Sequence, residues 1–117
     1  MINGEDLEFV NKVIPLMGIK KSIVVTTDPS TESYPDIWIQ RGFFSDTITV
    51  TQEWARQNTH ERRKRLVHEL LHSLGENHWD APKNVNMGDK TLSVLYSTYP
   101  DQDTYSALVY SYLLNRL

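Results

Sequence analysis

The sequence contains no cysteine, and this absence removes several kinds of site at the outset. Without thiols the chain has no disulfide, no thiolate zinc site and no latency device built on a cysteine ligand. The chain also lacks a large excess of either charge, because its formal net charge is only -3 and no extended block of one sign dominates. Composition therefore gives no indication of a nucleic-acid or membrane partner.

Long hydrophobic runs are missing as well. No apolar segment approaches the ~20 residues that a membrane-spanning helix needs. The first six residues are acidic and lack the basic and then apolar pattern of a secretory signal. We therefore expect a cytoplasmic protein with no membrane association.

The 117 residues suffice for one compact domain, and we expect residues 1–117 to form it. β-branched and alternating segments predict strands, while apolar residues at helical spacing predict helices. A polar stretch with Pro82 and Gly88 predicts a long loop over 76–92, and turn residues mark 28–35. This order predicts an α+β fold with helices flanking a small mixed sheet of about three strands. The predicted strands are 21–27, 37–40 and 47–51, and the predicted helices are 5–16, 59–74 and a final one from near Asp101.

The middle helix has clear start and stop signals. Asn58 with Glu61 three residues later has the form of a capping box, although Thr59 can cap instead. Gly75 stands where a left-handed residue ends a helix. We expect each helix to bury one apolar stripe. The stripes are Leu7, Val10 and Ile14 in the first helix, with Phe9 as a further candidate, Leu66, Val67, Leu70, Leu71 and Leu74 in the middle one, and Tyr105, Leu108, Val109, Tyr112 and Leu113 in the last.

The segment HELLHSLGENH, residues 68–78, holds three of the four histidines. Residues four apart share one face of a helix, so His68 and His72 can direct their imidazoles at one Zn²⁺. Gly75 lets the chain turn out of the helix, and His78 can then return as a third ligand. Three protein ligands leave one position for water, which is typical of a catalytic zinc. Glu69 lies beside that position and can act as the catalytic base.

This segment matches HExxHxxGxxH, and the protein therefore resembles the metzincin metallopeptidases. The resemblance to their matrixin branch extends over roughly residues 36–117. Asp36-Ile37-Trp38 is similar to the start of a matrixin strand, and 47–54 (TITVTQEW) to the strand before the active-site helix. Residues 92–99 (LSVLYSTY) are similar to the turn beneath the metal, and a helix rich in Leu and Tyr follows.

The resemblance implies a reduced metzincin fold and a zinc endopeptidase that acts on a peptide or protein. It places Leu95 as the apolar floor beneath the metal, where metzincins carry methionine. It also implies that Ser97, Thr98 and Tyr99 line the pocket for the substrate residue after the scissile bond. Asp103, rather than Asp80, is the implied brace of the turn. With fewer strands than the family, Ile37–Arg41 would receive the substrate if it forms the exposed edge, and otherwise peptide binding would be weak or unlike that of the family.

Two other interpretations remain open. Endoribonucleases that mature ribosomal RNA carry a similar HGxLHLxGxDH run, and Arg62-Arg63-Lys64-Arg65 could hold phosphates. That family has glycine where this chain has Glu69, and the basic cluster is more simply a solvated helix face, so no nucleic acid is expected. The third interpretation is a zinc-binding module of the same fold that cuts weakly or not at all.

Overall fold

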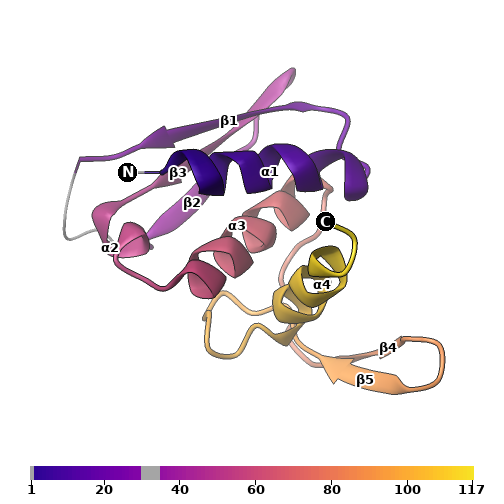
Figure 1. Cartoon of the computed structure of the whole chain (residues 1–117). Coiled ribbons are helices and arrows are strands. Elements are labelled where there is room, and N and C mark those ends of the chain that lie inside the picture. The colour runs from indigo at the N-terminus through magenta and orange to yellow at the C-terminus, as the bar shows by residue number, and fades with distance from the viewer. Residues whose placement is uncertain (1, 30–34) are drawn as a thin grey trace.

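The computed structural model describes residues 2–29 and 35–117. The predicted α+β class with a small mixed sheet is confirmed, and Figure 1 shows the arrangement. The turn predicted over 28–35 falls largely on residues 30–34, outside the described residues. Among the residues that the structure describes, no helix is both long and apolar enough to cross a bilayer. The elements are α1 (Gly4–Leu16), β1 (Ser22–Thr27), β2 (Ile37–Gln40), β3 (Ser45–Val50), α2 (Gln52–Ala55), α3 (Thr59–Ser73), β4 (Lys83–Asn86), β5 (Thr91–Val94) and α4 (Thr104–Leu114).

The three-stranded sheet is built around β3. β1 pairs with β3 in parallel and β2 pairs with it antiparallel, so β2 lies at an edge of the described sheet. Ile37 stands opposite Val50 and Ile39 opposite Ile48, and alternate β3 residues are buried. The segment expected at the substrate-receiving edge thus contains a strand at an edge of the sheet.

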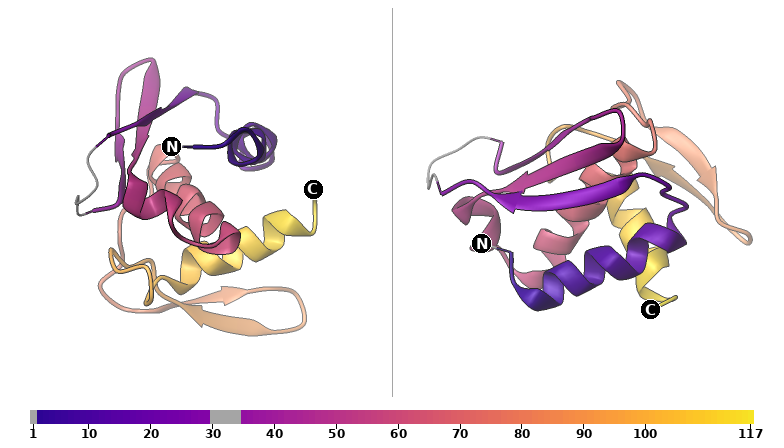
Figure 2. Two further views of the ribbon diagram at one scale, coloured as in Figure 1. Left: turned by 60° about the vertical axis from the view of Figure 1, so that its left-hand side comes forward. Right: turned by 90° about the horizontal axis from the view of Figure 1, so that it is seen from above.

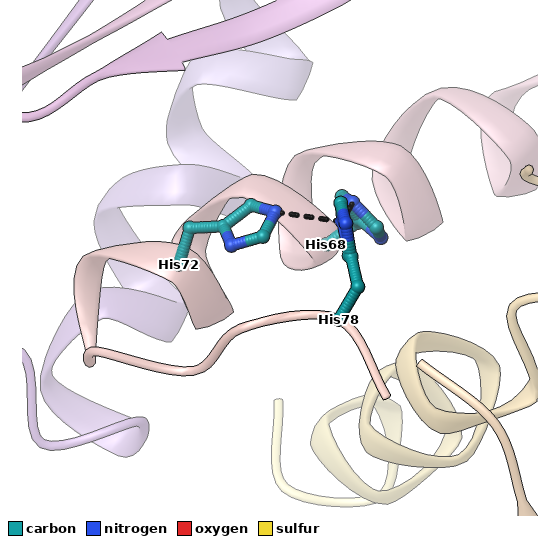
Figure 3. A group of neighbouring side chains, drawn as sticks. All are labelled: His68, His72 and His78. Carbon is teal, nitrogen blue, oxygen red and sulfur yellow. Dashed lines mark hydrogen bonds between the residues drawn. The ribbon is translucent and has the colours of Figure 1, made fainter. Parts of the chain in front are cut away.

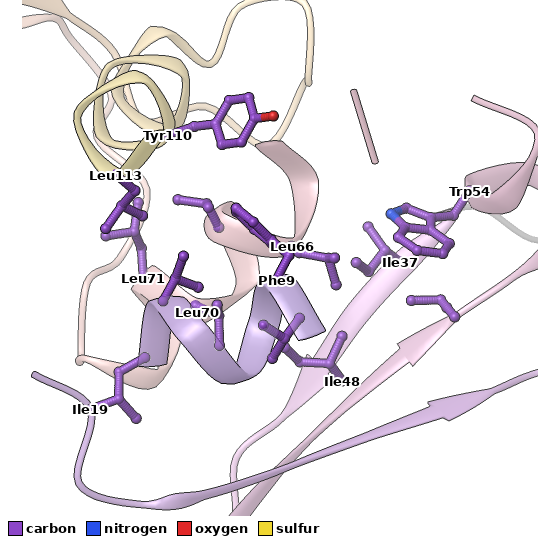
Figure 4. Packing of buried hydrophobic residues seen from close by; sticks show 14 of the residues in the cluster. Phe9, Ile19, Ile37, Ile48, Trp54, Leu66, Leu70, Leu71, Tyr110 and Leu113 are labelled. Carbon is purple, nitrogen blue, oxygen red and sulfur yellow. The ribbon is translucent and has the colours of Figure 1, made fainter. Parts of the chain in front are cut away.

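The hydrophobic core is centred on α3, which packs against α1, β2 and α4. Figure 2 shows α3 between the sheet and α4. Trp54, just after the sheet, and Leu66 and Leu70 of α3 are fully buried. Figure 4 shows side chains from all of these elements meeting around α3. Burying such side chains contributes roughly 1.5–3 kcal/mol each, so α3 is held in place chiefly by packing.

The ends of α3 follow the prediction. The Asn58 side chain accepts a hydrogen bond from the Glu61 backbone N–H at 2.9 Å, which confirms Asn58 as the cap. Gly75 has φ of +94°, the left-handed conformation expected after the helix. The predicted apolar stripe is buried except for Leu74, which is 44% exposed because it lies beyond the last helical residue.

The largest difference from the prediction lies in 76–92, expected to be a loop. The structure has a β-hairpin there, with Val85 of β4 opposite Leu92 of β5. The Met87 N–H donates to the Lys90 carbonyl at 2.8 Å, and Gly88 takes φ of +86° in the turn. Figure 1 shows this hairpin extending away from the main sheet. Its strands carry too few apolar residues for the alternation that signals a strand.

The other helices differ in detail from the prediction. α4 begins after Asp103, which caps it, and not near Asp101. Tyr112 is 44% exposed and Tyr110 takes the buried position instead. In α1, Leu7 is 41% exposed and Phe9 is buried. The short helix α2 follows β3 directly and was not predicted, because four residues give no helical period.

The basic cluster of α3 is not the solvated face that the sequence suggested. Arg62 and Arg63 both bond the buried carboxylate of Asp6 in α1, at 2.8 and 3.1 Å. The Arg63 guanidinium also lies 5.3 Å from the centre of the Phe9 ring. The two arginine side chains are only 14% and 21% exposed. These cations therefore join α3 to α1.

A second buried carboxylate, Asp46 of β3, joins the sheet to the C-terminal end of α3. It accepts hydrogen bonds from the Lys21 ammonium at 2.5 Å, the Gly42 N–H at 2.9 Å and the Ser73 hydroxyl at 2.6 Å. The Arg41 Nε lies 3.4 Å away. Burial alone raises the pKa of Asp46, but the hydrogen bonds from Lys21, Ser73 and Gly42 outweigh it and the pKa lies below 3.8.

We predict that Asp46→Ala lowers the free energy of unfolding by about 2–3 kcal/mol, because it removes several bonds to a buried charge. Urea denaturation followed by circular dichroism measures this loss. The lowered pKa means that the contribution is present above pH 3.8 and is lost as the pH falls through the lower folded-state pKa, so the difference from the parent should shrink in acid. Glu53→Ala, which removes an exposed pair with Arg56, is the control and should cost less than about 1 kcal/mol. Equal losses for the two variants would contradict the role given to Asp46.

Candidate metal centre

Three imidazoles converge at the C-terminal half of α3. His68 and His72 project from adjacent turns, and the chain after Gly75 brings His78 back to them (Figure 3). The Nε2 atom of His78 lies 3.0 Å from that of His72 and 3.2 Å from that of His68. The three residues predicted as ligands are therefore brought together, and each offers one nitrogen to a common point.

The outer nitrogen of every imidazole is held by the protein. Each Nδ1 atom has an oxygen partner, and two of these partners can only accept a hydrogen bond. In those two rings Nδ1 therefore carries the proton and Nε2 presents a lone pair. The partners are the Asp103 carboxylate for His68, the Glu76 carbonyl at 2.8 Å for His72 and the Thr98 hydroxyl at 2.9 Å for His78.

This arrangement fits a metal ion. Nitrogen lone pairs that face each other at 3.0–3.2 Å repel unless something positive lies between them. One proton on His78 can satisfy only part of the set, whereas a cation at the centre satisfies all three nitrogens. Outer-nitrogen hydrogen bonds of this kind also fix the orientation of metal-binding histidines. His68, His72 and His78 can therefore hold a metal ion.

The protonation states agree with this conclusion. Burial lowers the pKa of His72 to about 4, and the neighbouring His68, His78 and Arg41 act in the same direction. Burial also lowers the pKa of His78, again with help from His68. Only a neutral imidazole binds a metal, so a lowered pKa favours the binding-competent form at neutral pH.

The floor beneath the imidazoles contains a residue that sequence reasoning missed. The Tyr96 ring centre lies 4.7 Å from that of His68 and 5.1 Å from those of His72 and His78. Its hydroxyl donates to the His68 carbonyl at 2.7 Å, and burial raises the pKa of this hydroxyl. Tyr96 is fully buried and directly follows Leu95. The floor role expected of Leu95 itself stays a prediction.

Glu69, the predicted base, lies beside the cluster. It is 7% exposed and lines two adjoining depressions, both of which also contain His72. Burial raises the pKa of Glu69 to about 8, and the negative charges of Asp36 and Asp103 act in the same direction. A divalent cation at the centre would favour the ionised carboxylate and oppose this shift.

The first depression, which we call the β2 pocket, has a volume of about 160 Å³. One wall is Pro35 to Trp38, at the start of β2, and another is α3 from Lys64 to Glu69. Thr98 and Pro100 close a third side. Of the three residues expected to line a substrate pocket, Thr98 does so here. Ser97 is buried with its hydroxyl on the Tyr99 N–H, and Tyr99 is 57% exposed.

The cations at the β2 pocket are already paired. Arg65 bonds the Asp36 carboxylate, and Lys64 bonds Glu61 at 2.8 Å. Asp36 also accepts a hydrogen bond from Gln57 at 2.7 Å. Most side chains that line the pocket are polar or charged, but these contacts hold the cations back and the exposed surface of the pocket is mainly apolar.

Comparisons with known proteins do not identify a family. A scan against protein-family models, a search of curated proteins and a search of solved structures each returned no match. The metzincin resemblance therefore stays a prediction from the sequence.

We predict that Asp103→Asn weakens zinc binding by about tenfold or more, because the His68 Nδ1–H loses its carboxylate partner. Asparagine can still cap α4, whose Ser106 N–H bonds Asp103 at 3.1 Å, so the helix should persist. Competition with a chromophoric chelator measures the affinity. Asp80→Asn is the matched control, since Asp80 is exposed, and it should leave the affinity unchanged. An Asp103→Asn variant that binds zinc like the parent would refute the bracing role.

Proposed function

We propose that the protein is a zinc-dependent endopeptidase, with His68, His72 and His78 as metal ligands and Glu69 as catalytic base. The observation that carries the proposal is the convergence of three Nε2 atoms beside a buried carboxylate. Zinc suits this set because it binds three imidazoles readily and keeps a fourth position open in catalytic sites. A purely structural metal site would have no use for Glu69.

The residues divide the chemistry between them. A zinc ion held here would supply Lewis-acid polarisation of a carbonyl and a lowered pKa for water. Glu69 lines both depressions and can take a proton from the attacking water. The same carboxyl group can then deliver the proton to the leaving amine. Its burial excludes bulk water from the proton transfer.

The substrate would lie along β2. The outer edge of this strand carries backbone groups that can pair with an extended peptide, which adds a strand to the sheet. The β2 pocket opens beside the histidines at the Ile37 end of the strand. Its apolar walls suit an apolar side chain on the substrate residue after the scissile bond.

The contacts give less support to the ribonuclease alternative. The four cations that could hold phosphates are all engaged in ion pairs with carboxylates of the chain. Glu69 would also repel a phosphodiester beside the metal. A zinc-binding module without activity remains the other outcome, and it is separated from the proposal by experiment.

We predict that Glu69→Gln keeps zinc and lowers kcat/KM for a quenched peptide by at least about 10²-fold, because the isosteric amide cannot take a proton. Zinc content by mass spectrometry and peptide hydrolysis should be measured on the same preparation. A variant that cuts as well as the parent would exclude Glu69 as the base.

Substrate class is tested by incubating the protein with casein and with RNA side by side. We expect casein to be cut, RNA to remain intact and a chelator to abolish the cutting, since the metal would polarise the substrate carbonyl and lower the pKa of the attacking water. Cleavage of RNA alone would favour the nuclease, and cleavage of neither would favour the zinc-binding module.

A further inference from the structure

The second depression adjoins the β2 pocket beside His72. It is a shallow groove with Trp38, Glu69 and His72 in common with the pocket. Beyond them it is bounded by Ile39, Arg41 and Asn77. Arg41 directly follows β2, so the groove and the pocket lie near opposite ends of one edge strand.

Arg41 is fixed in this groove by the protein. Its Nε atom lies 3.4 Å from the buried Asp46 carboxylate, and its Nη1 atom donates to the His72 backbone carbonyl. The side chain is nevertheless 46% exposed, and Nη2 has no hydrogen-bond partner within the described part of the chain. A guanidinium held at two points with donors to spare is preorganised to bind a carboxylate.

The charge around Arg41 is not neutralised. Asp46 is shared between Arg41 and Lys21, so the three groups together carry one net positive charge. Asn77 is neutral, and Glu69 is the acidic residue of the groove, at its metal end. An anion beside Arg41 would therefore find an attractive site, in contrast to the β2 pocket, where Arg65 is paired with Asp36 and also lies 3.8 Å from Glu61.

The direction of β2 decides which part of a substrate meets Arg41. β2 runs from Ile37 at the pocket to Gln40, and Arg41 follows at the groove. Antiparallel pairing is slightly the more stable arrangement per residue, and a peptide added in that way runs against β2. Its residues before the scissile bond then lie near Arg41, and those after it lie at the β2 pocket.

We propose, resting on the peptidase function above, that Arg41 selects substrates with an acidic side chain on the N-terminal side of the scissile bond. The substrate class is thus an extended peptide with Asp or Glu before the bond and an apolar residue after it. Arg41 acts as a specificity-determining residue in the binding of this side chain, and not in the chemical step.

The test uses quenched peptides of one sequence in which each of the residues before the scissile bond is in turn Glu, Gln or Lys. We expect kcat/KM to be about fivefold higher for Glu than for Gln at one of these positions, a typical effect for a partly exposed ion pair. Lys at that position should be cut more slowly than Gln. The preference should fall at high salt, which screens exposed charges.

Substitutions of Arg41 test whether this residue causes the preference for Glu over Gln. In Arg41→Gln the Glu-to-Gln ratio should fall to about one, and Arg41→Lys should restore part of it because the charge returns. Arg56→Gln, which removes an exposed arginine paired with Glu53 outside the groove, should keep the full ratio. Any loss of zinc caused by the Arg41 contact to His72 lowers both rates equally and cancels in the ratio.

Peptide binding tests the same preference without catalysis. The zinc-loaded Glu69→Gln variant should bind the Glu peptide about fivefold more tightly than the Gln peptide in a calorimetric titration, and Arg41→Gln in that background should bind both alike. Hydrolysis without an acidic preference, or a preference that survives Arg41→Gln, overturns this inference and leaves the peptidase intact. Absence of hydrolysis for every peptide overturns both.

Discussion

The meeting of three imidazole nitrogens at 3.0–3.2 Å is the interaction on which the other features of the site depend. A cation at the centre satisfies all three nitrogens, whereas one proton on His78 satisfies only part of the set. Hydrogen bonds at Nδ1 keep each ring in this orientation. Each outer nitrogen is tied to a different segment: α4 through Asp103, the loop after α3 through Glu76, and the turn after β5 through Thr98. Three segments of the chain thus hold the imidazoles at a site that could bind a metal ion, beside the buried Glu69.

The fold supplies rigidity where the site needs it. Tyr96 lies under all three rings and bonds the His68 carbonyl, and its own carbonyl accepts from the Trp79 N–H at 2.9 Å, next to His78. At the other end, Asp46 and Arg41 connect the sheet to the last turn of α3. β2 is thus held beside α3, which carries His68 and His72. The β2 pocket lies at the Ile37 end of β2, and the groove lies at its Arg41 end.

The sequence predicted the three histidines of the cluster because their positions follow from local rules. Helical spacing gives His68 and His72, and a left-handed Gly75 allows His78 to return. The cap of α3 and the three strands of the main sheet were predicted for the same reason. Tyr96 and Arg41 were missed because their roles depend on which segments meet in space. The hairpin 83–94 was missed because its strands are polar, and the ion pairs of Arg62 and Arg63 because Asp6 lies in another helix.

The central claim is that these three histidines share one zinc ion. The most direct measurement is a calorimetric titration of zinc into metal-free protein, compared with His78→Ala. The claim predicts one zinc per chain for the parent and an affinity lower by orders of magnitude for the variant, since two neutral imidazoles make a weak site. Equal zinc affinity in the two proteins, or no zinc binding by the parent, would contradict it.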